Sequence, residues 1–266
     1  MTVTRLDARN VWVEYYIARK RERFVAVKDV SLQIDDGEFV SLLGPSGCGK
    51  TTFLNAIDGL KHVTRGEIRI DDKVVTKPGK DRAMVFQSSA LLPWRDVLGN
   101  VAYGLELQGV NKSSGHARAR DLIKLVGLAG FEERYPNELS GGMQQRVNIA
   151  RALATDPEIL LLDEPFANLD AQTREFMQSE LLRIWAATHK TAIFVTHNIV
   201  ESVYLSDRVV VFTARPGRVK EIVNIDLPRP RPLKIKRSPE FINYEEHIWE
   251  LLQDEIAKTG LTVNVS

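Results

Sequence analysis

Two short segments of this chain combine residue types that bind phosphate. Gly44-Pro-Ser-Gly-Cys-Gly-Lys50-Thr51 has P-loop spacing, in which backbone N–H groups surround a β-phosphate, the lysine adds charge and the threonine can ligate Mg²⁺. Leu139-Ser140-Gly141-Gly142 is a second glycine turn at the start of a predicted helix, and such a turn can hold an anion. It precedes an apolar strand, 159–163, which ends in an acidic pair. Two phosphate-binding turns followed by that strand indicate an ATPase that works as a pair.

The acidic pair is Asp163-Glu164, and its two carboxylates have separate predicted tasks. Successive side chains of a strand point to opposite faces, so the two groups need not meet the same atom. Asp163 is expected to reach Mg²⁺, directly or through water, and Glu164 to polarise the water that attacks the γ-phosphate. The alternative is an Asp-Glu turn that merely ends a strand.

Two further polar residues follow predicted strands. His197 ends Phe194-Val-Thr-His, where an imidazole can reach the γ-phosphate; a solvated loop histidine is the alternative. Gln87 follows the strand 83–86, where an amide can contact Mg²⁺ or the attacking water; the alternative is a surface glutamine. The other four histidines have no such setting.

Elements of both types must position these residues. Alternating apolar residues predict strands within 4–43, a helix from 49 to 60 and further strands at 67–70 and 83–86. Helical periodicity then fills about 95–155, before buried strands at 159–163 and 191–196 flank a helix around 171–188. The expected fold is an α/β P-loop NTPase core, a mixed sheet with helices, carrying an antiparallel β subdomain and an inserted α-helical subdomain.

The C-terminal region differs in composition. Asp226-Leu-Pro-Arg-Pro-Arg-Pro232 predicts an extended basic linker, either solvated or close to anionic headgroups, and solvation is favoured. An amphipathic helix follows, with Phe241, Tyr244, Ile248, Leu251 and Leu252 on one side. We therefore expect an ATPase domain at 4–232 and a helix and tail at 233–266 that pack on the ATPase or on a dimer partner.

Composition excludes several classes of protein. The 266 residues are 44% hydrophobic and 27% charged, as in ordinary globular proteins, and the net charge of +1 argues against nucleic-acid binding. No apolar run approaches the roughly 20 residues that span a bilayer, so we expect a soluble chain whose membrane role comes through a partner. The one cysteine, Cys48, lies in the P-loop, where Lys50 and a helix start are expected to lower its pKa and raise its reactivity.

Over nearly its whole length the chain resembles the ATPase subunits of ABC transporters. The resemblance implies a Walker A motif at 44–51, a Q-loop at Gln87, the family signature at 139–143, Walker B at 159–163, a D-loop at 168–170 and a switch histidine at His197. Tyr15 stands near the family's adenine-stacking aromatic, although Tyr16 is a rival and a strand-core tyrosine is an alternative. The expected ATP-binding residues are Gly44, Pro45, Ser46, Gly47, Cys48, Gly49, Lys50, Thr51, Thr52 and Tyr15.

The same resemblance implies how the chain works. Each ATP is expected to lie between the P-loop of one subunit and Ser140, Gly141 and Gly142 of another. The expected Mg²⁺ ligands are Thr51, Gln87 and Asp163. The expected catalytic residues are Glu164, His197 and Gln87. It implies a homodimer bound to transmembrane permease subunits at the cytoplasmic face of the inner membrane, an indirect periplasmic or extracellular solute-binding protein, and no nucleic acid. Met143 and Asn168 depart from the family pattern, which leaves open the contact made by the fifth signature residue.

Three runs of sequence resemble importers of taurine, aliphatic sulfonates and nitrate: Leu91-Leu-Pro-Trp-Arg95, 163–174 and Ala214-Arg-Pro-Gly-Arg-Val219. The apolar segment 88–95 is expected either to dock a short permease helix or to pack within the helical subdomain. The main alternative is a soluble ABC ATPase for repair or translation, which usually carries two cassettes or long coiled coils; an exporter ATPase and a kinase fit less well.

Overall fold

The computed structural model describes residues 3–17, 19, 21–88 and 90–258. The described residues fall into two compact units. Unit 1 lies within 1–79 and 191–266, and unit 2 spans Lys80–Lys190. None of the helices described in these ranges is long and apolar enough to cross a membrane.

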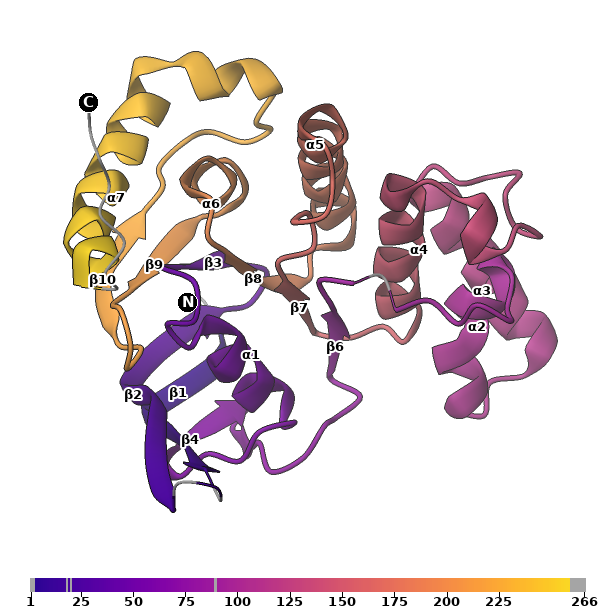
Figure 1. Cartoon of the computed structure of the whole chain (residues 1–266). Helices are drawn as coiled ribbons and strands as arrows, with labels where there is room; N and C mark the ends of the chain where they lie inside the picture. The colour runs from indigo at the N-terminus through magenta and orange to yellow at the C-terminus, as the bar shows by residue number, and fades with distance from the viewer. Residues whose placement is uncertain (1–2, 18, 20, 89, 259–266) are drawn as a thin grey trace. The chain divides into compact units, whose positions relative to one another are not determined.

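Unit 1 contains an antiparallel sheet at its N-terminal end (Figure 1). Its strand order is β2-β1-β4-β5, and alternate residues of β1 and of β2 bury one face of each strand. Core positions on β1 include Leu6, Val11 and Val13. The strands are β1 Thr4–Ile17, β2 Glu22–Asp35, β4 Arg65–Ile70 and β5 Lys73–Val74.

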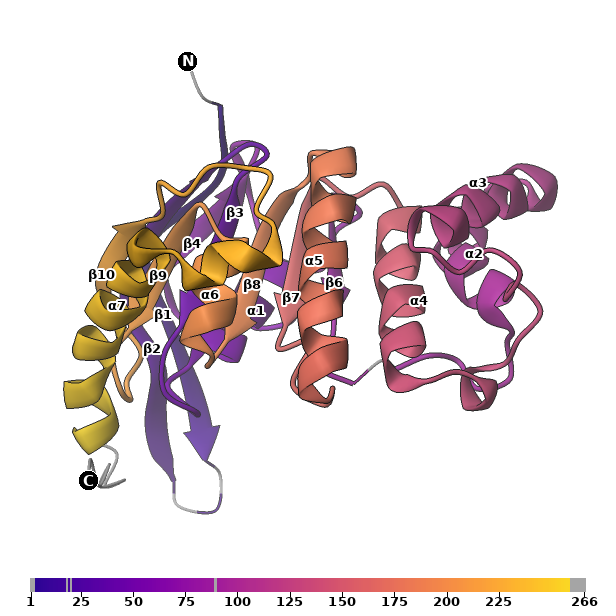
Figure 2. The same cartoon turned by 90° about the horizontal axis from the view of Figure 1, so that it is seen from above.

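The other strands of unit 1 follow the order β10-β9-β3-β8, and β3 is parallel to both of its neighbours. All five residues of β3 are buried, as expected for a strand covered on both faces. α7 runs along α6 and the strands β9 and β10 (Figure 2). The elements are β3 Phe39–Leu43, α1 Lys50–Asp58, β8 Thr191–Thr196, α6 Ile199–Leu205, β9 Arg208–Phe212, β10 Val219–Asn224, the 3₁₀ turn η2 Leu233–Arg237 and α7 Pro239–Lys258.

Unit 2 contains a parallel strand pair and most of the predicted helices. Side chains of Asp96, Asn111, Ser140 and Asp170 cap the starts of its four α-helices, which is why each begins where it does. The predicted helix around 171–188 is confirmed. The elements are β6 Arg82–Val85, α2 Val97–Leu107, α3 Lys112–Leu125, η1 Pro136–Glu138, α4 Gly141–Ala154, β7 Ile159–Asp163 and α5 Ala171–Thr188.

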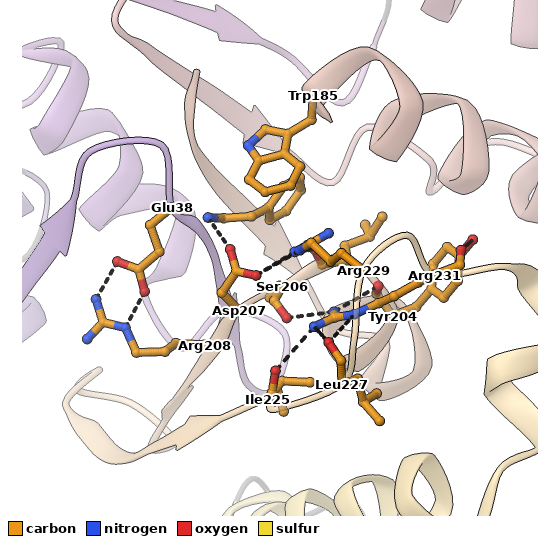
Figure 3. A network of polar contacts seen from close by, with 12 residues as sticks. Glu38, Trp185, Tyr204, Ser206, Asp207, Arg208, Ile225, Leu227, Arg229 and Arg231 are labelled. Carbon is orange, nitrogen blue, oxygen red and sulfur yellow. Dashed lines mark hydrogen bonds and ion pairs between the residues drawn. The ribbon is translucent and has the colours of Figure 1, made fainter. Parts of the chain in front are cut away.

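The linker at 226–232 is solvated only in part: Asp226 and the three prolines are exposed, but Leu227 and Arg231 are buried, so the prediction is wrong for these two residues. Arg231 is 5% exposed and donates to the carbonyls of Val203, Tyr204 and Ser206 at the end of α6 (Figure 3). Helix C-termini leave such carbonyls without partners in the helix, and their partial negative charge favours a cation. Burial, with a smaller contribution from Arg229, lowers the pKa of Arg231 to about 10.

The neighbouring Arg229 ties the same linker to the start of β9. Its Nε donates to Asp207 Oδ1 at 2.9 Å, and a second nitrogen donates to the Leu205 carbonyl at 2.8 Å. Asp207 in turn accepts from the Phe39 backbone N–H at 2.9 Å through its other oxygen (Figure 3). The two arginines therefore tie the linker to unit 1, while its prolines stay exposed.

The C-terminal helix packs on unit 1 through its predicted apolar side. Phe241, Ile248 and Leu252 are at most 4% exposed, and the Tyr244 hydroxyl accepts from the Asp226 backbone N–H at 3.1 Å. Residues 259–266 of the predicted tail lie outside the described residues.

Candidate functional site

The P-loop follows the buried strand β3 and leads directly into α1. Gly49 has a φ of 112°, and a Cβ there would stand 2.5 Å from the Ala26 carbonyl oxygen. A side chain at this position is therefore excluded both by the backbone conformation and by the neighbouring strand. The glycine spacing read from the sequence is a requirement of this tightly packed loop.

Lys50 is the first residue of α1 and is 4% exposed. Its Nζ donates to the carbonyls of Gly44 at 2.7 Å and Pro45 at 3.0 Å, which holds the ammonium group inside the loop. Ser46 and Thr51 are exposed on the same loop. A buried cation, two hydroxyls and the start of a helix together fit a nucleotide phosphate, and the Thr51 oxygen suits Mg²⁺.

The predicted reactive thiolate at Cys48 is wrong. The side chain is 1% exposed, and burial raises the pKa of the thiol. Lys50 acts in the opposite direction, but its attraction is the smaller of the two effects. Desolvation of the charged form outweighs the nearby ammonium, so Cys48 behaves as a small apolar residue that fills the loop.

The two candidate adenine-stacking residues occupy different environments. The Tyr15 hydroxyl lies 3.2 Å from Thr52 Oγ1, and the Lys61 ammonium lies 5.0 Å from the centre of its ring. Tyr16 is 65% exposed. Tyr15 is thus tied to the helix that the P-loop begins, whereas stacking on adenine stays a prediction for either ring.

His197 follows β8, which is the parallel neighbour of β3. The register pairs Leu43 with Thr196, so the P-loop and His197 leave the sheet at the same edge. Thr196 Oγ1 donates to the buried carboxylate of Glu201 at 2.7 Å and accepts from the Asn198 N–H at 3.0 Å. These bonds fix the turn that carries the exposed His197.

Unit 2 repeats this geometry with a second pair of parallel strands. The register of β6 and β7 pairs Val85 with Leu162, so Gln87 and the Asp163-Glu164 pair follow the same sheet edge. Asp163 and Glu164 are half-buried and Gln87 is exposed. Glu164 has a φ of 43°, a left-handed conformation that a non-glycine residue adopts at some cost and that often marks functional sites.

The signature turn lies at the start of α4 in the same unit. Ser140 caps this helix by accepting from the Met143 N–H at 3.4 Å, and Ser140 and Gly141 are exposed. Gly142 is buried, and a Cβ there would stand 2.8 Å from Thr173 Cγ2 on α5. The turn therefore presents a hydroxyl and the start of a helix to solvent, which is a suitable surface for an anion.

Two arginines that the motifs did not single out support these loops. Arg174 donates to the carbonyls of Leu169 at 2.8 Å and Phe166 at 3.4 Å, and so holds the predicted D-loop. Arg151 donates to the Ala90 carbonyl at 2.9 Å, behind Gln87. The position of Arg174, four residues after the helix cap Asp170, could have indicated in the sequence that it contacts this loop. No such feature of the sequence indicates the contact of Arg151.

Part of the apolar segment at 88–95 packs within unit 2, and docking of a permease helix stays a prediction; residue 89 lies outside the described residues. Arg95 is used within unit 2, since it pairs with Glu106 at 2.8 Å and lies 4.9 Å from the Tyr103 ring centre. Buried Asn100 accepts from the Leu92 N–H at 2.8 Å and so holds the segment. Trp94 is 71% exposed and is left available for a partner.

Comparison with known proteins identifies the family. The ABC transporter family matches residues 27–167. An uncharacterised ABC transporter ATP-binding protein of Methanocaldococcus jannaschii is 56% identical, covering 89% of this chain and 88% of the relative. The taurine import ATP-binding protein TauB of Burkholderia pseudomallei is 44% identical, covering 95% and 98%. The nitrate import ATP-binding protein NrtD of Synechocystis is 45% identical, covering 88% and 90%.

Solved structures agree with these relatives. A dimeric ATP-binding cassette in a post-hydrolysis state, bound to ADP and Pi, superposes with a TM-score of 0.73 at 34% identity, covering 84% of this chain and 100% of that one. The expected fold class and the resemblance to the taurine and nitrate import group are confirmed. The chain belongs to the ABC transporter family, as an ATP-binding subunit that hydrolyses ATP.

Proposed function

We propose that this chain powers an importer as a homodimer, with each ATP held between the P-loop of one copy and the signature turn of the other. The observation that carries the proposal is the exposure of Ser140 and Gly141 at the start of α4. An anion-binding helix start that faces solvent is suited to a phosphate presented by a second molecule. The same chain already has its own phosphate site at Lys50.

The residues have distinct proposed roles in hydrolysis. Lys50 binds the β- and γ-phosphates, and Thr51, Gln87 and Asp163 offer the oxygen ligands that Mg²⁺ prefers. Bound Mg²⁺ would neutralise charge on the phosphates. Glu164 accepts a proton from the attacking water, and His197 contacts the γ-phosphate from the sheet edge shared with the P-loop.

The transport role rests on the relatives and on one surface residue. Proteins named for taurine and nitrate import are 44–45% identical to this chain over most of its length. We therefore infer a small anion such as taurine, a sulfonate or nitrate as the solute, delivered by a solute-binding protein to a membrane permease. The exposed Trp94 is an aromatic anchor of the kind that interfaces use, and it would dock the permease at the cytoplasmic face.

The test is reconstitution in lipid vesicles with a candidate permease and a candidate solute-binding protein. Solute-loaded binding protein should stimulate ATP hydrolysis, and Trp94→Ala should reduce that stimulation while leaving the basal rate of the isolated subunit unchanged. Trp249→Ala is the matched control, since this tryptophan is also exposed but lies on α7. Equal stimulation of the two variants would contradict docking through Trp94.

The alternative is an ABC ATPase that is not coupled to transport, or an importer of another molecule. Stimulation by a different solute would correct the substrate and leave the importer role intact. Failure of the chain to associate with any permease would favour the uncoupled enzyme.

A further inference from the structure

The turn between β9 and β10, residues 213–218, packs against the P-loop within unit 1. Arg215 Nε donates to the Gly47 carbonyl at 2.9 Å. Gly217 comes so close that a Cβ there would stand 2.2 Å from the Cys48 carbonyl oxygen. Two successive carbonyls of the P-loop therefore face this turn.

The hydrogen bond from Arg215 to the Gly47 carbonyl also constrains the backbone N–H of Cys48. A trans peptide directs its C=O and N–H to opposite sides, so fixing the Gly47 carbonyl also fixes the direction of the Cys48 N–H. That N–H donates to the Pro45 carbonyl at 3.3 Å, within the P-loop. Backbone N–H groups of a P-loop bind phosphate, so the shape of the loop sets where these donors point. Arg215 thus helps to hold the shape of the loop at 45–48 without touching the phosphate.

The turn is itself fixed to β2. Gly217 donates to the Ala26 carbonyl at 2.9 Å and accepts from the Lys28 N–H at 2.9 Å. The Arg215 guanidinium lies 4.9 Å from the centre of the Phe24 ring, which limits the rotamers open to this exposed side chain.

A buried carboxylate of the C-terminal helix holds the other side of the turn. Glu255 on α7 is 2% exposed, and its Oε2 accepts from the Ala214 N–H at 2.8 Å. Its Oε1 accepts from Lys220 Nζ at 3.2 Å, and the same ammonium donates to the Leu251 carbonyl at 2.7 Å. A pocket of about 570 Å³ is lined by residues of the P-loop, the turn and Glu255.

We propose that Arg215 is a positioning residue for the P-loop and that Glu255 holds the turn that carries it. The C-terminal helix therefore sets the affinity of the P-loop for nucleotide. This role goes beyond the proposed transport function and does not depend on it, because it requires only one chain and ATP.

The test compares Arg215→Ala with Arg218→Ala in the full chain. Both variants remove one exposed arginine from the same turn, but Arg218 makes no side-chain hydrogen bond among the described residues. Arg215→Ala should weaken binding of a fluorescent ATP analogue about fivefold and raise KM for ATP similarly, the loss expected from one hydrogen bond, with kcat little changed. Arg215→Lys should recover part of the affinity, because it keeps a donor. Equal affinities of Arg215→Ala and Arg218→Ala would overturn the proposal.

Glu255→Gln tests the helix separately and keeps the shape of the side chain. It should raise KM in the same direction as Arg215→Ala, with a smaller effect, because an acceptor for Ala214 remains. A lowered melting temperature with wild-type ATP affinity would mean that Glu255 only stabilises the fold. That result would overturn the proposal that Glu255 influences nucleotide affinity. Nucleotide binding is measured on the isolated chain below the concentration at which it dimerises, and KM and kcat above that concentration. Neither measurement needs a permease, so failure of transport cannot produce the same result.

Discussion

The P-loop of unit 1 and the signature turn of unit 2 are both glycine turns at the start of a helix, yet they differ in charge and burial. The P-loop contains the buried ammonium of Lys50, held by two carbonyls. Residues 139–143 carry no charged side chain, and their serine and first glycine are exposed. The P-loop is thus equipped to bind phosphate by itself, whereas the signature turn offers a hydroxyl and a helix start that would complete a site held elsewhere.

The largest effect should separate binding from turnover. Glu164→Gln should keep ATP affinity and reduce kcat about 1,000-fold, since it removes a general base. Lys50→Ala should instead weaken ATP binding about tenfold or more, because it removes a charged hydrogen-bond donor. The measurements are phosphate release at saturating ATP and titration with a fluorescent nucleotide.

Glu133→Gln, at an exposed glutamate of unit 2, is the matched control and should leave both quantities unchanged. Wild-type hydrolysis by Glu164→Gln would show that the base lies elsewhere.

A smaller effect is expected on the rate at which Cys48, inside the P-loop, reacts with maleimide. Because burial raises the pKa of Cys48, maleimide should label the folded chain at pH 7 about tenfold or more slowly than the chain in urea. The labelling rate should rise with pH at a higher midpoint when folded than when unfolded, since the folded state favours the neutral thiol. Cys48 is the one cysteine of the chain, so all label reports on it. Equal rates in the two states would contradict the burial.

Local patterns predicted much of this molecule. The P-loop spacing and the acidic end of β7 are set by a few adjacent residues, because a strand, a turn and a helix cap each depend on near neighbours. The predicted helix at 171–188 coincides with α5, whose cap Asp170 and apolar periodicity are both readable in the sequence.

Local patterns could not predict burial that depends on residues distant in the sequence. Arg231 lies in a Pro-Arg run that looks solvated, but three of its carbonyl partners lie 25 to 28 residues earlier in the chain. Cys48 looked activated because Lys50 and a helix start are two residues away or less, whereas the burial that raises its pKa comes from the folded core. Glu255 and Ala214 are 41 residues apart, and no local motif joins them.

The most direct test of the shared site measures dimer formation by size-exclusion chromatography with light scattering. With MgATP, Glu164→Gln should form a stable dimer, because ATP fills both sites and is not hydrolysed. Adding Ser140→Arg to that variant should leave ATP binding by the single chain intact and abolish the dimer, whereas adding Ser114→Arg, at an exposed serine on α3, should not abolish it. A dimer that persists with Ser140→Arg would contradict the claim that the signature turn of one copy completes the ATP site of the other.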